Sequence, residues 1–463
     1  MSAALAQFLC LLFVLWLYAR DSKQLPKLSW GLWLPLLWVI IIGSKPVSAW
    51  LGSGIEEATS DFSEGSPLDR AALLVLIAAG IAVLLPRRLQ WGKIFSQNKW
   101  LFIYFGYLAV SCLWSEYPFV SIKRWVKDAG NIVMVLVILS EKDPVAAAKA
   151  VLLRCGYLLI PFSVVYVKYI PSLGRYYDQW TGQPYYCGVM GNKNAMGMSL
   201  FVCTLFLFWK MVGQWDKRKA RSADKLDLPL HGFLMLMCGW LLFKAHSSTA
   251  MVCTILGAAI LLALRLPAVR SKVEKFGLYT GAIVIILLLL NSVVDLGTSF
   301  VELVGRDLTF TGRTAIWNLV LSEGTNPVIG VGFSSFWLGD RTARLSEAYF
   351  YDLNQAHNGY IETYLNNGYV GVALLLVVIA FSFRPIKRDV LSGVPFGALR
   401  LAFLIPALFY NMTEAAFDRL DLLWFGMLLV VIECPRIQRP VPATPKAETG
   451  RPKARWVAAP EGG

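Results

Sequence analysis

The chain has 463 residues, of which 56% are hydrophobic and only 16% are charged, and its formal net charge is +14. With a mean hydropathy of +0.55, this composition excludes an ordinary soluble domain and predicts an integral membrane protein. The positive charge does not indicate nucleic-acid binding, because most of it falls in alternate loops and no nucleic-acid-binding motif accompanies it.

Apolar segments predict an all-α fold, a polytopic transmembrane bundle of about twelve to thirteen spans. In chain order the thirteen candidate helices are 4–19, 30–43, 68–85, 100–114, 125–140, 147–168, 194–211, 229–244, 247–264, 276–291, 358–382, 396–411 and 421–433. Segments 30–43 and 421–433 are the weakest, because they fall short of the ~20 residues that a span needs. The eight cysteines are scattered singly, which favours buried apolar cysteines over a disulfide framework or a zinc site.

Lysine and arginine residues cluster in alternate loops, and cytoplasmic loops are the ones that carry such an excess. The basic segments are 20–27, 87–99, 142–149, 210–225, 265–275, 384–400 and the residues after 435. Under a thirteen-span topology they all lie on one face, which places the N-terminus outside and the C-terminus in the cytoplasm. We expect 1–434 to form one integral membrane domain, with a periplasmic loop over 292–357, and 435–463 to be a disordered basic cytoplasmic tail.

The loop over 292–357 is the first candidate for a reaction site, because long loops in compact proteins usually carry a function. It contains Arg313 in a Gly-Arg-Thr motif and Trp317, then a glycine-rich turn from Pro327 to Gly332, and it ends at His357. Asn358 and Tyr360 follow directly, at the start of the next apolar helix. Each feature also has a structural interpretation, since Arg313 can pair with Asp307 and His357 can cap a helix.

Two further polar clusters are predicted on the same outer face. In the first, Pro118 opens an amphipathic turn that presents Lys123, Arg124 and Lys127, which could equally be interfacial anchors. In the second, Gly191 to Gly197 is a glycine-rich entry to a helix, where Lys193 beside the free N–H groups would make an anion site. An ordinary turn with an N-cap explains the second cluster as well.

Taken together, these motifs resemble the signature of the O-antigen ligase and polymerase superfamily. The resemblance rests on Gly312-Arg313-Thr314 with Trp317, on Gly330-Val331-Gly332, and on the run from His357 to Glu362 followed by Gly368 and Gly371. The signature region spans about 180–380. The earlier elements, Trp114 to Arg124 and Gly191 to Gly197, look most like the exopolysaccharide polymerase branch of the succinoglycan type.

The resemblance implies a GT-C-like glycosyltransferase of the bacterial inner membrane. Such a multi-pass enzyme would transfer a glycan from undecaprenyl pyrophosphate to an acceptor hydroxyl on the periplasmic side, in exopolysaccharide or O-antigen biosynthesis. It would need no cofactor and no metal, because cationic side chains would neutralise the leaving pyrophosphate. Its expected partners are the lipid-linked glycan, membrane lipids and, by family association, a flippase and a chain-length regulator, with no nucleic acid.

The same resemblance suggests roles for individual residues. Arg313 would clamp the pyrophosphate, with Arg124 and Lys193 adding charge. His357 is the candidate catalytic residue, either as general base on the acceptor hydroxyl or as proton donor to the phosphate. The remaining candidates would contact glycan, and Glu362 is also a reserve base; they are Asn358, Tyr360, Glu362 and Trp317.

Three functions stay open from the sequence. A polymerase and an O-antigen ligase share the donor and differ in the acceptor, which is a second lipid-linked repeat unit or the lipid A core. The central motifs favour the polymerase. A lipid-linked oligosaccharide flippase or another transporter is the third alternative. Such folds usually show inverted repeats and charges at the membrane midplane, whereas this sequence shows no repeat and few mid-helix charges, of which Arg154 is the clearest.

Overall fold

The computed structural model describes residues 2–24, 28–52, 66–177, 182–219, 226–275, 313–349 and 353–434. Within these ranges the chain is helical apart from one two-stranded antiparallel hairpin, which confirms the all-α fold class. The expected helix 276–291, the expected tail 435–463, and residues 292–312 and 350–352 of the long loop lie outside the described residues.

The α-helices are α1 (Ala3–Gln24), α2 (Trp33–Ile42), α3 (Val47–Trp50), α4 (Pro67–Leu84), α5 (Trp91–Gln97), α6 (Lys99–Ser111), α7 (Pro118–Leu139), α8 (Pro144–Tyr169), α9 (Pro171–Gly174), α10 (Lys193–Lys219), α11 (Asp227–Ala245), α12 (Ser248–Ala263), α13 (Pro267–Arg270), α16 (Arg313–Ser322), α17 (Asp340–Tyr349), α18 (Gly359–Leu391), α19 (Pro395–Tyr410) and α20 (Leu422–Val431). The 3-10 helices are η1 (Trp30–Leu32), η2 (Leu85–Arg87), η3 (Cys112–Trp114) and η4 (Ser271–Lys275), and the strands are β1 (Arg175–Tyr177) and β2 (Pro184–Tyr186). Every expected helix within the described ranges is therefore present.

Among the described helices, six are long and apolar enough to cross a membrane, or seven if the bent pair Ser248–Ala263 and Pro267–Lys275 is one span. Four shorter apolar helices, of 10–17 residues, accompany them. The chain is thus a polytopic membrane protein, while the expectation of twelve to thirteen spans stays a prediction. Charge explains why α7 is not among the six, because Lys123, Arg124, Lys127 and Asp128 interrupt it.

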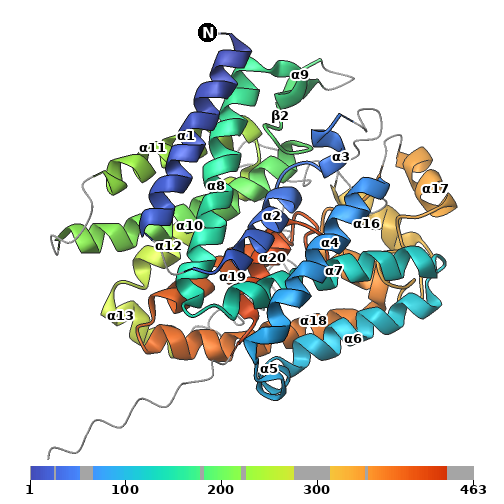
Figure 1. The fold of residues 1–463 in the computed structure, drawn as a ribbon. Helices are drawn as coiled ribbons and strands as arrows, with labels where there is room; N and C mark the ends of the chain where they lie inside the picture. The colour runs from blue at the N-terminus through green and yellow to red at the C-terminus, as the bar shows by residue number, and fades with distance from the viewer. Residues whose placement is uncertain are drawn as a thin grey trace, which may run out of the picture.

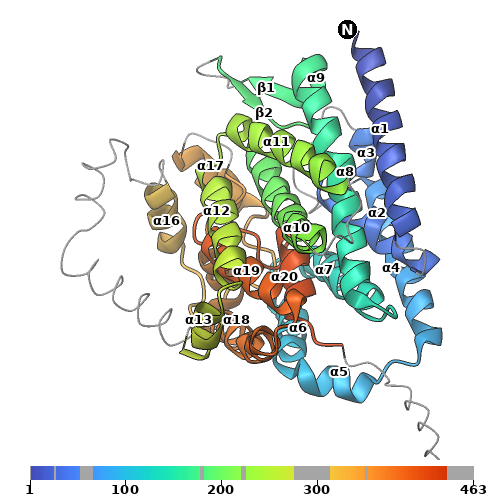
Figure 2. The same ribbon diagram turned by 90° about the vertical axis from the view of Figure 1, so that its left-hand side faces the viewer.

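Long helices pack side by side in the bundle, with α1 along α8 and α6 along α18 (Figure 1). The short elements α3 and α9, the hairpin, α16 and α17 gather toward one end, and α5 and α13 lie toward the opposite end (Figures 1 and 2). This separation agrees with the alternation of polar and basic loops. Which end faces the periplasm stays a prediction.

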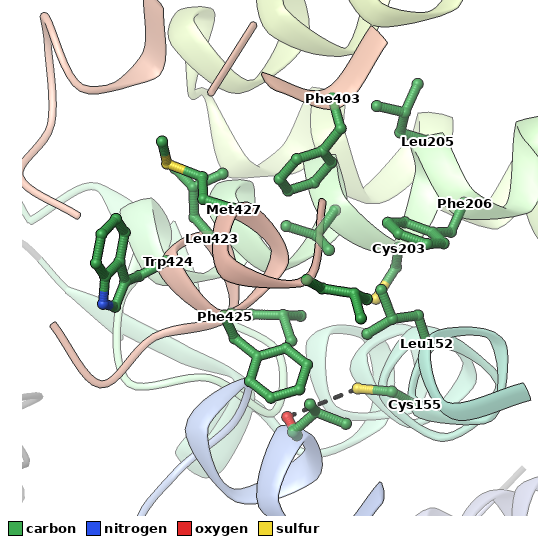
Figure 3. Packing of buried hydrophobic residues seen from close by; sticks show 14 of the residues in the cluster. Leu152, Cys155, Cys203, Leu205, Phe206, Phe403, Leu423, Trp424, Phe425 and Met427 are labelled. Carbon is green, nitrogen blue, oxygen red and sulfur yellow. Dashed lines mark hydrogen bonds between the residues drawn. The ribbon is translucent and has the colours of Figure 1, made fainter. Parts of the chain in front are cut away.

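The core of the bundle lies around α20, one of the two segments that the sequence predicts most weakly. Residues Leu422 to Val430 are all buried, because neighbouring helices surround α20, and it therefore shows no amphipathic stripe. Phe403, Phe425 and Cys155 pack in this core (Figure 3). Seven of the eight cysteines are buried and all eight are free, as the sequence predicts.

Candidate functional site

A polar cavity of about 200 Å³ opens between α7, α10, α18 and the turn from α19 to α20. Eight charged residues line it: Arg124, Lys127, Asp128, Glu362, Glu414, Asp418, Arg419 and Asp421. Because charged groups are costly to bury in a membrane protein, a cavity lined by this many is a functional-site candidate. Two of the predicted site residues, Arg124 and Glu362, lie in it.

Helix α7 carries three of these charges, and their one-face spacing follows from the helical repeat. Arg124 donates through its guanidinium to the backbone oxygen of Ser334, and at 3.3 Å to the hydroxyl of the same residue. Lys127 is 7% exposed and also lines the cavity. Lys123 instead makes a cation–π contact with Phe119, its amine lying 4.1 Å from the centre of the ring. Of the three basic residues, two therefore turn inward and one does not.

Lys193 begins α10, as the sequence predicts, but it is not among the residues that line the cavity. Its amine lies 4.0 Å from the centre of the Tyr185 ring, on the hairpin. The flanking Asn192 and Asn194 line the cavity instead, and the side chain of Asn192 accepts a hydrogen bond from the backbone of Ala195 at 2.8 Å. The N-cap interpretation of this segment is therefore correct, and the pyrophosphate role of Lys193 stays a prediction.

The glycine-rich turn from Pro327 to Gly332 docks the long loop onto a kink in α18. Gly368 interrupts that helix with φ 62°, and a Cβ there would lie 2.2 Å from the backbone of Val328. Reciprocally, a Cβ on Gly330 would lie 2.3 Å from the backbone of Asn366. The kink frees backbone groups that the loop then uses: Gly332 N donates to Asn366 O at 2.8 Å, and Tyr369 N donates to Pro327 O at 2.8 Å.

Glu362 lies one turn below the start of α18 and ties the loop to the cavity wall. Its carboxylate accepts from the indole N–H of Trp337 at 2.9 Å and from the backbone N–H of Ala356 at 2.6 Å, and it pairs with Arg419 at 3.5 Å. Trp317 donates to the carbonyl of the same Ala356 at 2.8 Å. Glu362 and Trp317 thus both fix the backbone of Ala356, the residue before His357. Their predicted contacts with glycan stay predictions.

Arg313 and His357 meet at one buried carboxylate, that of Glu414 in the turn between α19 and α20. One oxygen of Glu414 lies 2.7 Å from the Arg313 guanidinium, and the other lies 3.1 Å from His357 Nδ1. The Glu414 side chain is 5% exposed, whereas the His357 side chain is 26% exposed. The structure therefore brings together the two residues predicted to be catalytic, although Asp307, the other partner considered for Arg313, lies outside the described residues.

Asn358 and Tyr360 have structural contacts. The side-chain oxygen of Asn358 caps α18 by accepting from Tyr360 N at 3.0 Å and Ile361 N at 3.1 Å. The Tyr360 hydroxyl donates to Leu408 O at 3.2 Å, and its ring packs edge to face against Phe417. Neither is among the residues that line the cavity, so sugar binding by this pair stays a prediction.

Sequence reasoning missed the acidic and basic residues of the turn between α19 and α20. Glu414, Asp418, Arg419 and Asp421 all lie within this short connection between two apolar helices. Four charged residues in a short turn between two buried helices are unusual, so this part of the sequence could have been predicted to belong to the site.

Backbone strain also concentrates here. Among the described residues, five that are not glycine have a positive φ, and three of them, Ser334, His357 and Asp418, belong to the cavity wall or its approach. Such conformations are unfavourable and persist where surrounding contacts enforce them, which is common at functional sites.

The fold and the cavity define a polytopic membrane protein with a charged pocket, which described residues of the long loop help to line. Residues 233–376 match the family model described as O-Antigen ligase. The chain is also similar to the exopolysaccharide production protein ExoQ of Rhizobium meliloti (strain 1021), with 24% identity over 329 residues that cover 67% of this chain and 72% of that protein. These two findings confirm the resemblance to the O-antigen ligase and polymerase superfamily, and to its exopolysaccharide branch.

Proposed function

We propose that the chain is an inner-membrane polysaccharide polymerase that transfers a glycan from undecaprenyl pyrophosphate to an acceptor hydroxyl on the periplasmic side. The observation that supports this most is the Arg313–Glu414–His357 cluster beside a cavity lined by further cations. The similarity to the exopolysaccharide production protein ExoQ favours exopolysaccharide as the product.

The cations would hold the leaving group. Arg124, Lys127 and Arg419 line the cavity and would stabilise the charge that develops on the pyrophosphate as the sugar departs. Arg313 uses one side of its guanidinium on Glu414, and its planar fork has further N–H donors for phosphate oxygens. Because side chains supply this charge in the proposal, we expect transfer to continue when divalent ions are chelated.

His357 would accept the proton from the attacking hydroxyl. Glu414 is paired with Arg313, so its carboxylate accepts a hydrogen bond from His357 Nδ1–H, which leaves Nε2 with its lone pair. In the reaction the acceptor oxygen bonds to C1 of the donor sugar, the bond from C1 to the phosphate oxygen breaks, and the hydroxyl proton moves to Nε2. The pyrophosphate leaves with the bonding electrons. Glu414 thus positions the base and stabilises its charged form, as in other His–carboxylate pairs.

A ligase is the second candidate, because the matching family model is described as O-Antigen ligase. The donor half of the reaction would be the same, and the acceptor would be a lipid A core instead of a second repeat unit. The acceptor therefore decides between the two functions.

The test is glycan transfer by the purified full-length protein in EDTA, with an undecaprenyl-pyrophosphate-linked repeat unit as substrate. We expect a polymer ladder from the wild type and none from His357→Asn or Arg313→Ala. Asparagine tolerates the positive φ of His357, so that variant removes the imidazole without straining the backbone.

Matched controls are His246→Asn, an exposed histidine with φ 50°, and Arg344→Ala, whose side chain is 61% exposed on α17. Both should give wild-type ladders. Transfer only after a lipid A core acceptor is added would make the protein a ligase, and no transfer to either acceptor would contradict the proposal.

A further inference from the structure

Two carboxylates in the cavity each keep one oxygen without a hydrogen-bond partner among the described residues. The first belongs to Asp128 on α7, which is 2% exposed and lines the cavity. Its Oδ1 accepts from the indole N–H of Trp424 at 2.8 Å and from the Asn131 amide at 3.1 Å. Its Oδ2 is buried and accepts from no described donor.

The second belongs to Asp418, in the turn between α19 and α20. Its Oδ2 accepts from the Tyr104 hydroxyl, and its buried Oδ1 has no described donor. The residue is held at φ 57°, a conformation that is unfavourable without a glycine. Burial raises the pKa of this carboxyl to about 7, against the effect of the hydrogen bond from Tyr104.

A buried acceptor without a donor is costly, so two such carboxyl groups on residues that line one cavity favour a ligand that brings donors. A sugar is such a ligand, because each hydroxyl donates a hydrogen bond. The cavity wall also includes Phe417, whose ring offers an apolar face for the C–H side of a pyranose. An anionic sugar fits less well, because burial in this cavity already disfavours negative charge, as the raised pKa of Asp418 shows, and the sugar would bring a further carboxylate.

We propose that Asp128 and Asp418 form a subsite that binds a neutral sugar through its hydroxyl groups, and that rejects a sugar acid at the same position. The inference rests on the proposed function, within which this subsite holds the sugar whose hydroxyl attacks. Arg124 and Lys127 line the same cavity and hold the phosphates of the donor. The donor phosphates and the acceptor sugar therefore lie in one cavity.

The experiment measures sugar binding without any transfer reaction. Full-length protein in lipid nanodiscs is titrated with methyl β-glucoside or with methyl β-glucuronide, and the dissociation constant is taken from the rise in melting temperature. We expect the wild type to bind the glucoside saturably and the glucuronide at least roughly tenfold more weakly. Asp128→Asn and Asp418→Asn should each weaken glucoside binding by roughly tenfold and reduce the discrimination.

Asparagine keeps the shape of both side chains, and it tolerates the backbone of Asp418. Glu347→Gln, an exposed carboxylate on α17, is the matched control and should bind like the wild type. If Asp128→Asn lowers the melting temperature without ligand, Asp418→Asn decides, since it lies outside any helix.

Equal affinity in the wild type and both variants, a preference for the glucuronide, or no saturable binding would overturn the inference. Glucoside binding that depends on both aspartates in a protein without transfer activity would support the subsite and reject the polymerase. The two proposals therefore fail separately.

Discussion

Two clusters of buried charge in this protein are built on opposite principles. In the first half of α19, the Arg400 side chain is 4% exposed and pairs with Asp389 at 2.8 Å and Glu433 at 2.5 Å, and its Nε donates to Val430 O at 2.6 Å. In the cavity, Asp128 and Asp418 each keep a buried oxygen without a described donor.

The charged groups around Arg400 stabilise the fold, whereas those of the cavity are available to bind a ligand. Around Arg400 each charge has an opposite charge within hydrogen-bonding distance, so the cluster joins α18, α19 and the end of α20. Around Asp128 and Asp418 the protein leaves the last partner to be supplied from outside. Removing a charge should therefore destabilise the first region and, in the second, chiefly alter binding.

The largest loss of stability is expected from Arg400→Ala. This change leaves Asp389 and Glu433 without their buried partner, which typically costs about 3–5 kcal/mol. Thermal unfolding of the purified protein measures it. Arg388→Ala is the control, because Arg388 contacts the same two acids but its side chain is 67% exposed. A similar loss of stability in both variants would contradict the claim that the buried ion pair contributes more than the exposed one.

A smaller loss is expected from Gly368→Ala, at the kink on which the glycine-rich turn docks. The new Cβ would lie 2.2 Å from the Val328 backbone, at a positive φ that alone costs about 1–3 kcal/mol. We expect a lower melting temperature together with lost glycan transfer, since the loop carries Arg313 and His357. Gly239→Ala is the control, because a Cβ there meets nothing within 4 Å. Wild-type behaviour of Gly368→Ala would mean that the loop does not need this kink.

The smallest effect is a pH dependence of stability. Burial raises the pKa of Asp418 from 3.8 to about 7, so the folded state holds this proton more tightly than the unfolded state does. The resulting stabilisation is complete below about pH 4 and is lost as the pH rises through about 7. We expect the melting temperature to fall between pH 5 and pH 8 by roughly a few degrees, and to fall less in Asp418→Asn. An equal fall in both proteins would contradict this assignment.

Asp421 should also make stability fall as the pH rises. Burial raises its pKa to about 7, against the effect of its hydrogen bonds to the start of α20. Asp421→Asn should therefore flatten the same pH range, and the double variant should flatten it further. This series sharpens the comparison, because Asp418 and Asp421 both line the cavity and neither belongs to the cluster around Arg400.

The helices could be predicted from the sequence because apolar runs are a local signal. Even α20, too short for a confident span, begins within a residue of its predicted start. Arg313 and His357 were also found from local motifs. What joins them was not, because Glu414 lies 57 residues beyond His357 and only the packing of α18 against α19 brings it there.

Two motifs make contacts that their local sequence does not predict. The glycine-rich turn looked like part of a reaction site, whereas its glycines allow two backbones to approach closely. Lys193 stands at a helix start, as predicted, but the nearby Tyr185 ring holds its amine. In both cases the residue type was informative, but the contact partner could not be read from the motif itself.

Glycan transfer by Glu414→Gln tests the central claim most directly, namely that one buried carboxylate organises the catalytic pair. Glutamine keeps the size of the side chain and removes the charge that orients His357 and pairs with Arg313. We predict that transfer from the lipid-linked donor falls by roughly 100-fold or more while the protein remains folded in nanodiscs. Transfer within about twofold of the wild type would contradict the account.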